Sequence, residues 1–140
     1  MSMLMASQSN QYEIMAATVA AAQSRDQRVR KFAEAMINDH AHSRDSLGKA
    51  VIASNKSLPA PGMSSDQALL LGTLQSLRGS DFDRAYVKQQ VLAHIQAIAV
   101  EESFANAGAD KNLKAVVKSD LPMIREHLKM ARNLQAELEG

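Results

Sequence analysis

The stretch FAEAMINDHAHSRDSLGKAV, residues Phe32–Val51, carries apolar residues at helical spacing. Its apolar stripe consists of Phe32, Met36, His40, Leu47 and Val51. Side chains three, four or seven positions apart lie on one face of an α-helix, so the stretch predicts a helix with one buried face. His40 lies on that face, and its ring is expected to point into the protein. His42 falls on the polar face of the same helix and is expected to lie in solvent.

Helix-breaking and helix-capping residues divide the rest of the chain. Pro59, Pro61 and Gly62 mark the one long loop. A serine followed three residues later by a glutamine has the spacing of a capping box, and this occurs at Ser24 and Ser64. Asp110 is a candidate cap for the last segment. We therefore predict helices over about Ser7–Gln23, Asp26–Ser54, Ser65–Arg78, Asp81–Ala107 and Lys111–Leu138.

The predicted helices specify an all-α fold. Four long helices with short first and last connections and a long middle one form a four-helix bundle with one crossover. The short helix in the crossover is expected to pack across the side or end of the bundle. Pro122 removes one backbone hydrogen bond inside the last helix, so we expect a kink or restart near Asp120. The length fits a single domain, residues 1–140, of which residues 1–6 are expected to be disordered or to belong to an added or trimmed start.

The composition excludes several classes of function. The net charge is +1 and the charges are interleaved, which argues against nucleic acid as a partner. The chain has no cysteine, so disulfides, thiolate metal sites and cysteine nucleophiles are excluded. No apolar run approaches the roughly 20 residues that span a bilayer, and Met1–Asn10 lack the pattern of a signal peptide. A glycine-rich phosphate loop and a nucleophile elbow are absent too, and no organic cofactor is expected.

Three inward histidines and one glutamate form the candidate site. His94 and His127 lie on the apolar stripes of the last two long helices. Glu13 is about 12 residues before the first turn and His40 about 15 after it, which makes them nearly level at a rise of about 1.5 Å per residue. His94 lies about 14 residues before the turn near Gly108, and His127 about 18 after it. Four helices that each send one donor inward build metal sites in helical bundles.

This donor set would suit zinc, copper or iron, because imidazole is a borderline ligand and a carboxylate balances the charge of the ion. The candidates to orient the rings are Asp39, Glu101 and Glu126. Three methionines near the histidines would shift the preference toward copper(I), namely Met36, Met123 and Met130.

Plainer interpretations stay open for each of these residues. A histidine on an apolar face is commonly a hydrogen-bonded core residue, and methionine commonly fills the core. Glu13 and Asn10 have the spacing of a helix cap. The pattern also differs from a di-iron bundle, which needs Glu-x-x-His on two helices. Asp39 and His42 have that spacing on one helix, and the last helix offers no counterpart.

Three stretches resemble the bacterial ferritin-like family called domain of unknown function 4142: FAEAMINDH (Phe32–His40), FDRAYVKQQVLAH (Phe82–His94) and LPMIREHLKMARNL (Leu121–Leu134). The resemblance covers nearly the whole chain. The family pattern has a glutamate on the first helix, Asp-His on the second, and one histidine on each of the last two. In this sequence these positions are Glu13, Asp39, His40, His94 and His127. The resemblance implies a ferritin-like bundle that is exported to the periplasm, and it implies no established reaction.

Three hypotheses of function follow. In the first, a periplasmic bundle binds one transition-metal ion through Glu13, His40, His94 and His127 for sequestration, transfer or redox stress, with Asp39 and Glu101 in a second layer. In the second, the same site is a metal-dependent enzyme, which needs an open coordination position. In the third, the chain is a structural or interaction protein of the cell envelope that binds no metal. The sequence leaves the metal, the oligomeric state and the partner open.

Overall fold

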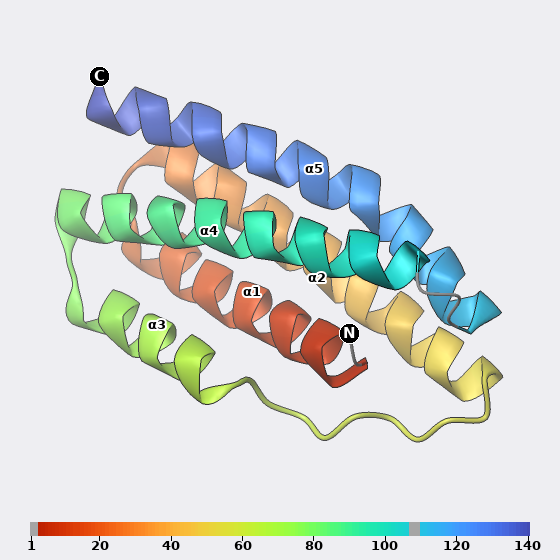
Figure 1. Cartoon of the computed structure of the whole chain (residues 1–140). Coiled ribbons are helices and arrows are strands. Elements are labelled where there is room, and N and C mark those ends of the chain that lie inside the picture. The colour runs from red at the N-terminus through yellow and green to blue at the C-terminus, as the bar shows by residue number, and fades with distance from the viewer. Residues whose placement is uncertain (1–2, 107–109) are drawn as a thin grey trace.

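The computed structural model describes residues 3–106 and 110–140, which contain five helices and no strand. The helices are α1 (Met3–Gln23), α2 (Gln27–Ala53), α3 (Ser65–Ser76), α4 (Gly79–Asn106) and α5 (Lys111–Glu139). The four long helices lie side by side, and α3 lies outside them (Figure 1). The predicted all-α bundle with one long crossover is confirmed.

Helix pairing follows the lengths of the connections. The chain reverses tightly between α1 and α2, which pack along each other, and α4 and α5 form the other close pair. Contacts between α2 and α5 join the two pairs. The crossover runs from α2 along the bundle, and its helix α3 packs on α1 and α4, so it covers a side of the bundle rather than an end (Figure 1). Gly79 starts α4 with a φ of +58°, which glycine adopts without steric cost, and lets the chain turn there.

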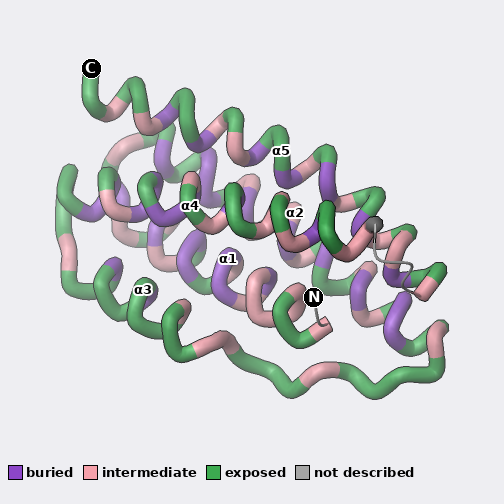
Figure 2. The backbone as a smooth tube through the Cα atoms, viewed as in Figure 1, coloured by how far each residue is buried: buried purple, intermediate pink, exposed green. Residues whose placement is uncertain are grey.

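The core consists of two apolar clusters. Buried residues line the inner faces of the long helices, whereas the crossover loop is mostly exposed (Figure 2). Met36 of α2 belongs to the larger cluster and Leu47 to the smaller one. The buried polar residues His40 and Ser43 fall between them on the same helix. A polar layer therefore separates the two clusters.

Two of the predicted caps are confirmed and one is wrong. Ser64 forms a reciprocal capping box with Gln67, and Asp110 accepts hydrogen bonds from the first backbone amides of α5. At α2 the cap is Asp26, whose carboxylate accepts from the amide of Arg28. Ser24 does not cap α2, because its hydroxyl donates to the carboxylate of Asp83 on α4 at 2.6 Å.

The start of α1 and the course of α5 past Pro122 differ from the sequence prediction. α1 begins at Met3, so residues 3–6 are helical where disorder was expected. α5 runs through Pro122 without a restart, and Asp120 accepts a hydrogen bond from Ser43 instead of capping a second helix. A proline removes only one backbone hydrogen bond, and the buried side chains of Leu121 and Ile124 hold this part of α5 on the core.

The turn predicted near Gly108 lies outside the described residues. None of the described helices combines the length and hydrophobicity that a membrane span requires.

The packing of α3 predicts unequal effects of two leucine substitutions. Leu74 is fully buried, whereas Leu69 on the same helix is 71% exposed. Leu74→Ala is expected to lower the free energy of unfolding by about 2–5 kcal/mol, because it leaves a cavity under the helix. Leu69→Ala should change it by less than about 0.5 kcal/mol. Urea denaturation followed by circular dichroism measures both, and equal effects would contradict the placement of α3 on the bundle.

Candidate metal centre

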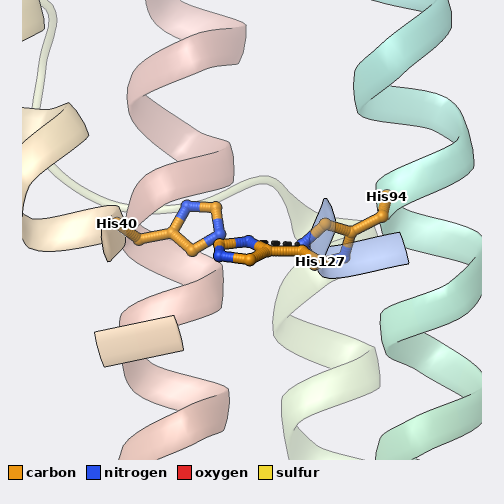
Figure 3. A group of neighbouring side chains, drawn as sticks. All are labelled: His40, His94 and His127. Carbon is orange, nitrogen blue, oxygen red and sulfur yellow. Dashed lines mark hydrogen bonds between the residues drawn. The ribbon is translucent and has the colours of Figure 1, made fainter. Parts of the chain in front are cut away.

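Each of the four long helices places one candidate ligand in the polar layer. Glu13 comes from α1, His40 from α2, His94 from α4 and His127 from α5, and each is only 2–3% exposed. The three histidine rings approach one another between the helices (Figure 3). Their ligand nitrogens all lie within 4.8 Å of one another. Glu13 Oε2 lies 3.8 Å from His40 Nε2 and 4.0 Å from His94 Nε2. The structure thus brings together the four predicted ligands, including His127, whose height along the helices matched the others less well in the sequence.

One nitrogen of each ring contacts an oxygen outside this group. His40 Nδ1 lies 3.0 Å from Asn10 Oδ1, and His94 Nδ1 lies 2.7 Å from the backbone oxygen of Gln90. His127 Nε2 lies 2.7 Å from Asp39 Oδ2. Because these oxygens only accept hydrogen bonds, each of the three outer nitrogens carries the ring proton.

The inner nitrogens of the neutral rings therefore carry lone pairs. His94 Nε2 and His127 Nδ1 face each other at 3.3 Å (dashed in Figure 3). Two lone pairs at this distance repel each other unless a proton or a metal cation lies between them. Within the described part of the chain, Glu13 Oε2 and His40 Nε2 are also buried without a hydrogen-bond partner. An unsatisfied buried polar atom costs about 1–3 kcal/mol, so this group of donors favours a cation at its centre.

The spacing of the donors fits a small metal ion. A tetrahedral zinc ion with ligand bonds of about 2.0–2.1 Å holds its donors about 3.3–3.4 Å apart. The 3.3 Å between His94 Nε2 and His127 Nδ1 already matches that value. The distances from Glu13 Oε2 to His40 and His94 would have to shorten by about half an ångström, and the widest separation among the ring nitrogens, up to 4.8 Å, by about 1.4 Å, which requires side-chain rotation.

Burial favours the uncharged forms of Glu13, His40 and His94 when no ion is bound. Burial raises the pKa of Glu13 to about 8, although a hydrogen bond from Gln90 Nε2 opposes this. Burial and the two neighbouring rings hold the pKa of His40 well below its usual value, and burial lowers the pKa of His94 to about 4. Neutral imidazole is the form that binds a metal. A metal ion therefore has to displace the proton of Glu13 but none from His40 or His94.

The other predicted site residues lie in different places. Asp39 precedes His40 and was predicted to orient its ring. In the structure, Asp39 contacts the ring of His127 on α5 instead. Glu126 is exposed on α5, and His42 is exposed on α2. Glu101 lines a pocket beside His40, and no hydrogen bond joins it to a histidine in the described residues. The three methionines divide between the core, where Met36 and Met130 pack, and that pocket, which Met123 lines.

Sequence reasoning missed two amides that hold the site. Asn10 was considered only as a helix cap, but it lies inside α1 and binds the ring of His40. Gln90 donates to Glu13 from α4, and its backbone oxygen accepts from His94. Asn10 lies three residues before Glu13 and Gln90 four before His94, so both amides share the inward face of their helices. An amide on an apolar stripe was the signal available in the sequence.

The comparisons with known proteins agree on a helical bundle. A family model described as "Domain of unknown function (DUF4142)" matches residues 2–134. Among solved structures, the chain is similar to the crystal structure of a candidate secreted protein, DUF305, from Streptomyces coelicolor. The two chains are 14% identical with a TM-score of 0.83, over 99% of this chain and 91% of that chain. At this identity the likeness concerns the fold alone. Among curated proteins, none matches the chain.

The raised pKa of Glu13 predicts how stability depends on pH in the metal-free protein. The pKa rises from 4.5 to about 8 on folding, so the folded state keeps a proton that the unfolded chain has lost. The contribution of Glu13 to the free energy of unfolding therefore falls as pH rises through this window, by about 1.4 kcal/mol per pH unit, whereas the lowered pKa values of His40 and His94 contribute a rise up to about pH 6.5. Glu13→Gln is expected to remove this contribution.

Urea denaturation of chelator-treated protein between about pH 5 and pH 8 measures the slope. Glu126→Gln, which changes an exposed carboxyl on α5, is the matched control and should keep the slope of the unmodified protein. The same slope in Glu13→Gln and in the unmodified protein would show that Glu13 does not hold a proton in the folded state.

Proposed function

The chain belongs to the DUF4142 family, and we propose that its bundle binds one transition-metal ion through Glu13, His40, His94 and His127. The observation that carries this proposal is the convergence of four electron donors in a buried layer, where Glu13 Oε2 and His40 Nε2 have no hydrogen-bond partner among the described residues. Three ring nitrogens lie within 4.8 Å of one another, and a carboxylate oxygen lies within 4.0 Å of two of the rings. The outer contacts of each ring fix the proton away from the centre, as in metal sites that orient their histidines.

The alternative of ordinary core histidines explains only half of these contacts. It accounts for the outer nitrogens, which bind Asn10, Gln90 and Asp39. It requires a proton between His94 Nε2 and His127 Nδ1, and it leaves His40 Nε2 and Glu13 Oε2 without a partner in the described residues. A cation would satisfy all of these atoms together.

The donor set also favours storage or transfer of the ion over catalysis. Three imidazole nitrogens and one carboxylate fill the four positions of a tetrahedral ion, and such a set suits zinc, copper or iron. A catalytic zinc site keeps a position open for water or substrate. Here each ligand is at most 3% exposed, which leaves a substrate no direct contact with the ion. A role in metal sequestration or transfer is therefore our first proposal, and a metal-dependent enzyme is the second.

We place this function in the periplasm as part of the same proposal. The support is the family resemblance and the description of the similar Streptomyces protein as a candidate secreted protein.

Removal of a central ligand should abolish metal binding. His94→Ala is expected to reduce bound zinc from about one ion per chain to near background after dialysis, because the three remaining protein donors hold the ion less tightly than four. His42→Ala removes an exposed histidine of α2 and is the matched control that should bind zinc normally. The measurement is elemental analysis of untagged protein after dialysis against zinc, with circular dichroism as the check of folding.

Two outcomes would contradict the proposal. Unmodified protein that retains no zinc, copper or iron after reconstitution does not have this function. Zinc that persists in folded His94→Ala protein lies at another site.

A further inference from the structure

A pocket of about 40 Å³ lies beside the candidate metal centre. The remaining wall is apolar, and the polar wall consists of Ser9, Asn10, His40, Ser43, Glu101 and Asp120. One water needs about 10–15 Å³ of such space, so the pocket has room for about three water-sized particles. His40 is the one member of the four-residue centre that lines it.

A chain of hydrogen bonds joins the pocket to the centre. The hydroxyl of Ser43 donates to Asp120 Oδ2 at 2.7 Å, and the amide of Asn10 donates to Ser43 Oγ at 3.4 Å. Asn10 Oδ1 in turn accepts from His40 Nδ1 at 3.0 Å. A charge held at Asp120 therefore acts on the orientation of a ring in the centre through two intermediate side chains.

Glu101 is the unexplained member of the pocket. It is 9% exposed, and its Oε2 is buried without a hydrogen-bond partner among the described residues. Burial, and then the charge of Asp120, raises the pKa of Glu101 to about 8, and burial also raises the pKa of Asp120. Two carboxyl groups in a small buried space are unfavourable as anions unless a cation neutralises them.

Glu101 also faces a route from solvent. An open groove of about 610 Å³ is lined by residues of α1, α4 and the start of α3. The groove and the pocket share three lining residues, Ala6, Ser9 and Glu101. Glu101 therefore lies where the groove and the pocket adjoin, and His40 lines the pocket.

We propose that Glu101, Asp120 and Ser43 bind a divalent cation in this pocket through their oxygens, as a loading site between the groove and the histidine centre. Carboxylate, hydroxyl and water oxygens suit hard ions such as Mn²⁺. A partly hydrated ion there exchanges more easily than one held by three buried imidazoles, which is what a loading site requires. The loading role rests on the proposed function of the histidine centre, whereas the cation site does not.

The cation site is tested with Mn²⁺ as the probe. Protein that has been given one equivalent of zinc and dialysed, so that only the histidine centre is filled, is titrated with Mn²⁺ while the electron paramagnetic resonance signal of free Mn²⁺ is followed. Glu101→Gln and Asp120→Asn should each weaken Mn²⁺ binding by about 10-fold or more. Glu102→Gln is the matched control, because it makes the same change in an exposed neighbour of Glu101. No Mn²⁺ binding to the unmodified protein, or equal binding to Glu101→Gln, would overturn the proposal.

A second titration separates this site from the histidine centre. Metal-free His94→Ala protein should still bind Mn²⁺, and the added Glu101→Gln substitution should weaken that binding. This result would support the cation site in the pocket even if the histidine centre held no zinc.

The loading role is tested by stopped-flow measurement, which should show slower zinc uptake in Glu101→Gln than in Glu102→Gln. Equal uptake rates would overturn the loading role.

Discussion

The structure depends on one electrostatic constraint, which is that buried electron donors must not face one another without a positive charge between them. His94 Nε2 and His127 Nδ1 meet at 3.3 Å, with Glu13 and His40 beside them. The outer contacts make this arrangement specific, because Asn10, Gln90 and Asp39 fix which nitrogen of each ring carries its proton. In the proposed function, a cation binds to the resulting cluster of lone pairs.

The scaffold holds this polar layer in place from both sides. The larger apolar cluster packs at one side of the layer and the smaller cluster at the other, so the four helices cannot slide without exposing apolar surface. An ion that binds only the folded chain would add stability by mass action, because it would link all four helices at once. The burial of the four ligands also keeps substrates from direct contact with the centre. The pocket lined by Glu101 is the proposed loading site for the ion.

Helical periodicity was sufficient to predict the bundle and the inward direction of three histidines, and residue counts from the turns made Glu13 and His40 level but matched His127 less well. It could not predict that Asp39 contacts His127 rather than His40, because that contact depends on the rotation of α2 relative to α5. The spacing of Asn10 and Glu13 fitted a cap equally well, and only the start of α1 at Met3 decides against it. The predicted cap at Ser24 was wrong because the partner of its hydroxyl, Asp83, lies on another helix. Contacts between helices carry information that one-dimensional spacing does not contain.

The assignment of protons within the three rings is tested most directly by long-range ¹H–¹⁵N nuclear magnetic resonance of the histidines, before and after addition of zinc. The proposed centre requires zinc to shift the ¹⁵N signals of Nε2 in His40 and His94 and of Nδ1 in His127. The outer nitrogens, which contact Asn10, Gln90 and Asp39, should remain protonated throughout. Zinc that shifts none of the inner nitrogens, or that binds the outer nitrogens instead, would contradict the centre described here.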